Sequence, residues 1–211
     1  MKAGQIGLTF NTHPEDPHRF TTSFANPDNP GRVIFLTVCA DHCLKRQARA
    51  LYDSHPQRHR EFRRPVAAGG SNVEFGFLPV ENTWRAEQGN PHKTANLQKR
   101  VIFRDRISDL SVPIALAVCK KPVVEAIKAR AAMFTGHAKH SALETAEYLE
   151  RLHHAYHGCL LNTAVKLDDP SKLDNVTRLY DYYRRWTVAL HAEGKPVLAS
   201  KGFKEGIAYQ T

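Results

Sequence analysis

Apolar residues along this chain fall into two patterns, short continuous runs and longer stretches with helical spacing. Two runs are continuous, one within residues 32–39 and one at 112–118, and both are rich in valine and isoleucine. Continuous runs of this length are typical of buried central strands. Shorter β-prone stretches extend the predicted sheet and lie at residues 5–10, 19–25 and 73–80.

Helical spacing of apolar residues predicts helices over residues 41–52, 92–110, 122–133, 141–167 and 173–192. Asp41 is suited to cap the first of these helices, and Pro122 suits the first position of the third. Ser141 and Glu144 form a capping box at the start of the fourth helix. The polar connection at 54–72 reads as a long loop, and loops of that length are usually functional or disordered.

The last two predicted helices each carry apolar residues at alternating steps of three and four, which is the spacing of a packing seam. A short link, Asp168-Asp169-Pro170, joins them. We therefore expect an antiparallel helical hairpin. The two seams are Leu149, Leu152, Tyr156, Cys159 and Thr163, and Val176, Leu179, Tyr183, Trp186 and Leu190.

The order of elements is β-rich, then mixed, then helical. This order favours an α/β or α+β fold in which a mixed sheet is packed by helices and followed by the C-terminal hairpin. No composition shift marks a linker, so we expect a single domain over residues 1–211. Its parts would be a sheet-containing portion (1–140), the helical hairpin (141–194) and a C-terminal strand or tail (195–211).

Composition limits where the protein acts. No apolar run approaches the roughly 18 residues of a membrane span, so no membrane partner is expected. The first residues lack the apolar core of a signal peptide, which favours a cytoplasmic location. In that compartment the four cysteines are expected to be reduced thiols.

Charge points to a polyanionic partner. The chain has 30 Lys and Arg against 21 Asp and Glu, which gives a formal net charge of +9. A basic protein attracts phosphate backbones by counterion release, so nucleic acid is the expected partner. RNA is slightly favoured over DNA, because no helix-turn-helix element is evident and the densest basic stretch is a loop.

The candidate contacts are basic residues in three places. Between Lys45 and Arg64 there are seven Lys and Arg against two acidic residues. A flexible arginine-rich loop grips phosphates without reading base sequence. On the last helix a tyrosine between two arginines is placed to stack a base, and near the C-terminus glycines let backbone amides approach a phosphate. The expected contacts are Arg58, Arg60, Arg63 and Arg64, then Arg178, Tyr182 and Arg185, and finally Lys201 and Lys204.

Two other functions stay open. The first is a nuclease that uses histidine acid–base chemistry or a metal ion, with His137 and His140 as the pair to test first. The second is a non-catalytic subunit of a larger assembly, with an interface at 69–84. The sequence has no P-loop, GxGxxG or GxSxG motif, and we assign no catalytic residue.

Metal and cofactor sites are not expected. Two groups bring thiols and imidazoles close in sequence, but neither has the spacing of a structural zinc site. We interpret them as buried thiols and surface histidines. The groups are Cys39, His42 and Cys43, and His153, His157 and Cys159.

Overall fold

The protein is described from a computed structural model of the full chain. The described residues are 12–13, 16–20, 23–26, 28–35, 39–58, 62–64, 73–109, 111–161 and 171–192. They divide into two units, one that ends at Cys39 and one that begins at Ala40. The single domain that the sequence predicts over residues 1–211 stays a prediction.

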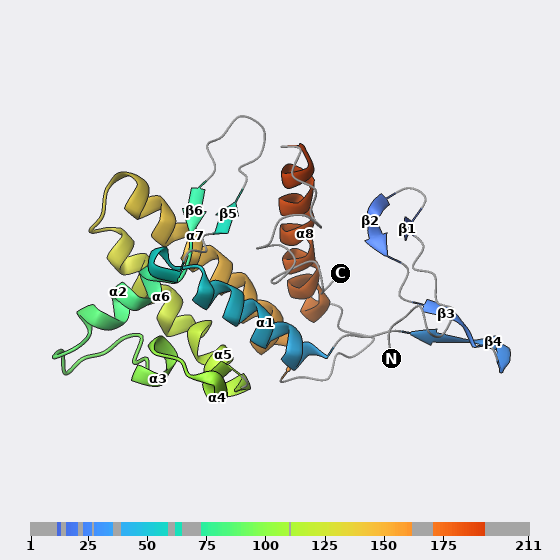
Figure 1. The fold of residues 1–211 in the computed structure, drawn as a ribbon, viewed down its shortest axis with the longest axis horizontal. Helices are drawn as coiled ribbons and strands as arrows, with labels where there is room; N and C mark the ends of the chain where they lie inside the picture. Colours follow the sequence, from blue (N-terminus) through green and yellow to red (C-terminus); the bar gives the residue numbers. More distant parts are fainter. Residues whose placement is uncertain are drawn as a thin grey trace. The chain divides into compact units, whose positions relative to one another are not determined.

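The first unit consists of two antiparallel β-hairpins (Figure 1). At the turn of the second hairpin, the backbone N–H of Asp28 donates to Oδ1 of Asn26 at 2.9 Å, which is an Asx turn. The predicted central strand at 32–39 is represented by β4, and among the described residues β4 pairs with β3 alone. The strands are β1 (Thr12–His13), β2 (Asp16–Phe20), β3 (Ser23–Asn26) and β4 (Asn29–Phe35).

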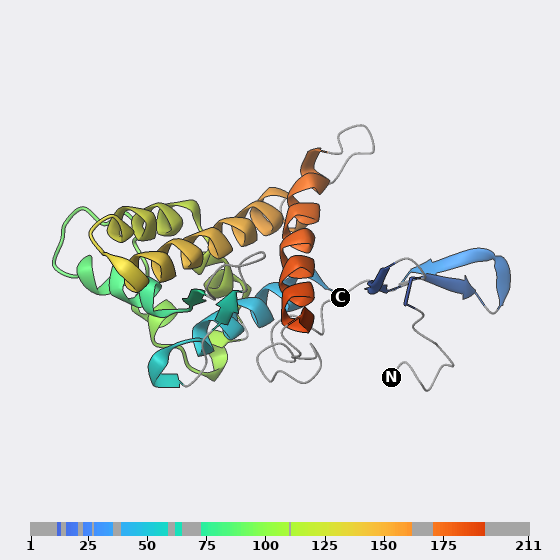
Figure 2. The same cartoon turned by 90° about the horizontal axis from the view of Figure 1, so that it is seen from above.

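The second unit is mostly helical, as Figures 1 and 2 show. Two of its strands, β5 and β6, form a third antiparallel hairpin. The elements are α1 (Ala40–Asp53), a 3₁₀ turn (Pro56–Arg58), β5 (Phe62–Arg64), β6 (Val73–Phe75), α2 (Leu78–Ala86), α3 (Lys99–Ile102), α4 (Arg106–Asp109), α5 (Val112–Val118), α6 (Lys121–Ala131), α7 (Gly136–Leu152), a π-helical segment (His153–Leu160) and α8 (Ser171–Ala192).

The prediction of an α/β or α+β fold with a mixed sheet is wrong. In the part of the chain that the structure describes, strands pair only two by two, and helices form most of the secondary structure. The apolar run at 112–118 is helix α5, and the stretch 73–80 contains the end of a hairpin and the start of α2. Pro113 and Pro79 lie in the first turns of these helices, where the missing N–H of proline removes no intrahelical bond.

Three helices lie close to their predicted ranges. Helix α1 buries Leu44, Ala48 and Leu51 on one face, as its spacing predicts. Helix α6 begins at Lys121 with a proline in its first turn, and α8 spans Ser171–Ala192. The spacing of apolar residues is therefore reliable where one face of a long helix meets the core.

Two other predicted helices differ from the structure. The stretch 92–110 is a loop followed by the short helices α3 and α4. Helix α7 begins at Gly136, whose φ of +57° suits glycine, so Ser141 and Glu144 lie inside the helix and do not cap it. The chain then continues in π-helical conformation to Leu160.

The two long helices of the predicted C-terminal pair are both present and contact each other. The Tyr183 hydroxyl donates to the Tyr148 hydroxyl at 3.3 Å, and the rings of Tyr148 and Tyr182 lie 6.2 Å apart. Thr163 and the side chains of Trp186 and Leu190 lie outside the described residues. The seam residues found buried are Leu149, Leu152, Tyr156, Cys159, Leu179 and Tyr183.

Gly76, which follows β6, lies in contact with the end of α1 and with α7. The backbone N–H of Phe77 donates to the carbonyl of Ser54 at 2.6 Å. A Cβ on Gly76 would lie 2.0 Å from that same carbonyl oxygen, so only glycine permits this approach. The hydroxyl of Thr145, a fully buried residue of α7, lies 3.1 Å from the Gly76 carbonyl oxygen and 3.4 Å from its amide nitrogen.

Candidate nucleic-acid interface

The predicted arginine cluster is described only through its backbone. Arg58 ends the 3₁₀ turn after α1, and Arg63 and Arg64 lie in β5, where Arg63 is in register with Glu74 of β6. The side chains of these arginines lie outside the described part of the structure, as do Arg60, Lys201 and Lys204. Their role in phosphate binding stays a prediction.

The three contacts predicted on α8 differ in their exposure to solvent. Arg178 and Arg185 are exposed, as expected for a basic face. Tyr182 is 3% exposed, and the guanidinium of Arg151 lies 5.0 Å from its ring centre. The expectation that Tyr182 shares the exposed face is therefore wrong. The buried face of α8 is wide enough to include both Tyr182 and Tyr183, because α8 packs against the Tyr148 side chain.

A basic surface that the sequence analysis did not single out lies between α2 and α4. Residues 88–104 contain no Asp or Glu. Lys93, Lys99 and Arg100 are exposed there, and none of them forms an ion pair with a carboxylate of the described residues. We call these three residues the 93–100 basic surface. The absence of Asp and Glu from residues 88–104 is visible in the sequence and indicates this surface. It was missed because residues 92–110 were predicted to form a helix.

The backbone beneath this surface is held by a carboxylate. Both oxygens of Glu87, at the end of α2, accept hydrogen bonds, one from the Ala95 N–H at 2.7 Å and one from the Asn96 N–H at 3.1 Å. Asn96 has a φ of +45°, in the left-handed region that asparagine tolerates. Ala95 and Leu97 are buried and anchor the segment to the core. The cations are therefore presented from a segment that is fixed at both its backbone and its apolar side chains.

Arg104 lies in the same stretch, but its guanidinium contacts aromatic rings and a backbone carbonyl. Its guanidinium lies 4.8 Å from the ring centre of Tyr52 and 5.9 Å from that of Phe77. It also donates to the carbonyl of Ala48 in α1 at 3.3 Å. Arg104 is therefore a packing residue, and we exclude it from the basic surface.

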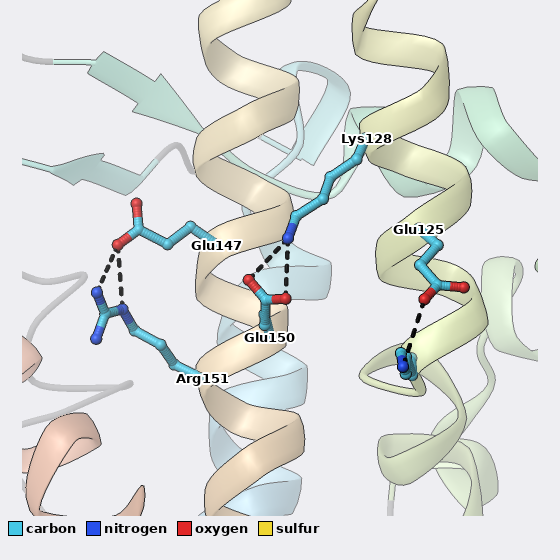
Figure 3. Close-up of polar contacts among 6 residues, drawn as sticks. Glu125, Lys128, Glu147, Glu150 and Arg151 are labelled. Carbon is cyan, nitrogen blue, oxygen red and sulfur yellow. Dashed lines mark hydrogen bonds and ion pairs between the residues drawn. The ribbon is translucent and has the colours of Figure 1, made fainter.

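Three cations on α6 and α7 are paired with carboxylates, as Figure 3 shows. Lys128 of α6 contacts both oxygens of Glu150 in α7, at 2.8 and 2.9 Å. Arg151 contacts Glu147 at 2.6 Å, and Lys121 lies 3.7 Å from Glu125. These pairs offset the charge of three cations, so this face is a weaker candidate for phosphate binding than the 93–100 basic surface.

The histidine pair singled out for acid–base chemistry lies in the first turns of α7 and not in a loop. His137 and His140 are both exposed. His137 lines a cavity of about 360 Å³ between the end of α1, α2 and α7, together with Ser141 and Asn82. Most of the cavity wall is apolar, with Phe75 and Phe134 among its members. The geometry gives His137 no acidic partner in this cavity.

Of the cysteines, Cys119 and Cys159 are buried and Cys39 is exposed. Burial raises the pKa of the Cys119 thiol to about 12, which makes it unreactive at neutral pH. Among the described residues no group of three or more His, Cys, Asp or Glu is arranged to hold a metal ion. His153 and His157, interpreted from the sequence as surface residues, are half-buried.

Comparison of the chain with models of known protein families finds no match, and comparisons with curated proteins and with solved structures find none either. Within the described helices, none has both the length and the apolar character needed to cross a membrane.

Proposed function

We propose that this protein binds nucleic acid through the phosphate backbone, with RNA slightly favoured over DNA. The observation that carries the proposal is the 93–100 basic surface: three exposed cations on an anchored segment, without a matching carboxylate among the described residues. Such cations attract phosphates and release condensed counterions when they bind. The preference for RNA comes from the sequence, in which the densest basic stretch is a predicted loop and no helix-turn-helix element is evident.

The contacts predicted from the sequence are kept in the proposal with one exception. Arg178 and Arg185 remain part of the proposal because both are exposed. The predicted contacts Arg58, Arg60, Arg63, Arg64, Lys201 and Lys204 also remain part of it. Tyr182 does not, because a buried ring offers no face to a base. We also propose that the protein acts in a reducing, cytoplasmic compartment, where cysteine thiols stay reduced.

The proposal is tested by measuring affinity for labelled single-stranded RNA and for duplex DNA across a salt series. The test variant carries Lys93→Gln and Lys99→Gln. The matched control carries Lys121→Gln and Lys128→Gln. It also removes two positive charges, but from lysines that already have carboxylate partners. Each phosphate contact contributes roughly 0.7 to the slope of log affinity against log salt for a single strand.

We expect the test variant to lose about 1.4 from that slope and the control to lose much less. Equal losses would mean that binding follows net charge alone and that the 93–100 surface has no special role. Failure of the wild-type protein to bind at low salt would refute the proposal as a whole and would favour the assembly-subunit alternative.

The same reactions distinguish a nuclease from a binding protein. The RNA is recovered after incubation and separated on a denaturing gel, with and without a chelator. Intact RNA supports binding alone. Cleaved RNA would show an enzyme, and loss of cleavage in His137→Ala would assign this histidine to the chemistry.

A further inference from the structure

Three histidines lie together on the π-helical segment. The ring centroids of His153 and His157 are 4.7 Å apart with their planes tilted by 39°, and the ring of His154 lies 5.7 Å from that of His153. Nδ1 of His153 and Nε2 of His157 are both buried and have no hydrogen-bond partner among the described residues. Buried nitrogens of polar side chains are rarely left in this state.

The two partnerless nitrogens belong to residues four positions apart on the π-helical segment, Nδ1 on His153 and Nε2 on His157. A neutral imidazole has one ring nitrogen with a free lone pair, and that nitrogen is the atom that binds a metal ion.

Neutral imidazole is the commonest metal ligand among protein side chains, and it binds through Nδ1 or Nε2. Imidazole nitrogens bind zinc at about 2.0–2.1 Å, and two such ligands meeting at tetrahedral or right angles place their ring centroids about 5 Å apart. The observed separation of 4.7 Å agrees with this geometry.

We propose that His153 and His157 bind one divalent transition-metal ion of the zinc class, through Nδ1 of His153 and Nε2 of His157. Imidazole favours zinc, cobalt, nickel and copper over magnesium and calcium. No third ligand is arranged beside them within the described ranges, so water fills the other positions and the site is open to an external ligand. The proposal departs from the expectation of no metal site, and it is independent of nucleic-acid binding.

The test uses the full chain without a polyhistidine tag, treated with a chelator and then titrated with Co²⁺ as a visible spectroscopic probe. The variants are His153→Gln and His157→Gln, with His154→Gln as the matched control because it is adjacent and exposed. We expect one Co²⁺ per chain, displaced by Zn²⁺, in the wild-type protein and in His154→Gln. Affinity falls at least tenfold in each of the other two variants.

Three results would overturn the proposal: no binding, unchanged binding in His157→Gln, or an intense thiolate charge-transfer band that places the ion on a cysteine. Circular dichroism shows whether each variant folds. A second measurement needs no variant, because Zn²⁺ added to the wild-type protein with ¹⁵N-labelled histidine shifts the ring nitrogens of the ligands. One histidine bound through Nδ1 and one through Nε2 is expected, and any other pattern refutes the assignment.

Discussion

Replacement of Gly76 by alanine tests the contact that joins α1, β6 and α7. The added methyl group would lie 2.0 Å from the Ser54 carbonyl oxygen and 3.0 Å from its carbonyl carbon. Both atoms belong to the backbone, so no side-chain rotation relieves the overlap. The chain has to separate by about an ångström at this point to reach ordinary van der Waals distance.

That movement breaks the 2.6 Å hydrogen bond from the Phe77 N–H to Ser54 and displaces Gly76 from the Thr145 hydroxyl. The net contribution of a hydrogen bond to the free energy of unfolding is about 1 kcal/mol, and a buried polar group left without a partner lowers that free energy by about 1–3 kcal/mol. We therefore expect Gly76→Ala to lower the free energy of unfolding by about 2–4 kcal/mol. This is a large fraction of the roughly 5–15 kcal/mol that stabilises a typical domain.

The assay is urea unfolding followed by far-ultraviolet circular dichroism. The matched control is Gly158→Ala, because a Cβ at that position would lie an ordinary 3.4 Å from the side-chain nitrogen of Asn175. The control should change the free energy of unfolding by less than about 1 kcal/mol, since alanine mainly restricts the unfolded chain. If Gly76→Ala is no less stable than Gly158→Ala, the reasoning from the close approach is wrong.

Two further predictions concern charge and ionisation. Burial raises the pKa of the Cys119 thiol to about 12 and raises the pKa of Tyr148 and Tyr183 well above their usual range, so the unfolded chain releases these protons at lower pH than the native one. The free energy of unfolding should therefore fall as pH rises from about 9 to 12, and unchanged stability in an alkaline titration by circular dichroism would contradict this. The side chains of Lys128 and Glu150 are 43% and 40% exposed. A double-mutant cycle should therefore give a coupling free energy of only about 0.2–1 kcal/mol, and this coupling should weaken in 1 M salt. A coupling above about 2 kcal/mol would show that this pair is more than a surface contact.

The helices that were predicted correctly and those that were missed differ in one physical respect. Helix α1 has polar residues between its buried leucines, so its period is visible in the sequence. In α5 nearly every residue is apolar, and such a run fits a buried strand as well as a buried helix. Pro113 was the distinguishing signal, because proline is common in the first turn of a helix and rare inside a central strand.

The candidate site was harder to predict from the sequence than the helices, because it depends on tertiary contacts. Helical spacing places Tyr182 near Arg178 and Arg185, but only the packing of α8 against Tyr148 decides how wide its buried face is. The pairing of Lys128 with Glu150 joins two helices and has no signature in sequence spacing. The sequence does contain the stretch without carboxylates at 88–104, which needs no structure to be seen.

The hydrogen bonds of Glu87 have a consequence for the heat of binding. Since its carboxylate already satisfies the N–H groups of Ala95 and Asn96, the segment that carries the basic surface is ordered in the free protein. A ligand that binds there does not fold the segment. Association should thus lack the large negative heat-capacity change of coupled folding, and calorimetry should show a nearly constant enthalpy over temperature.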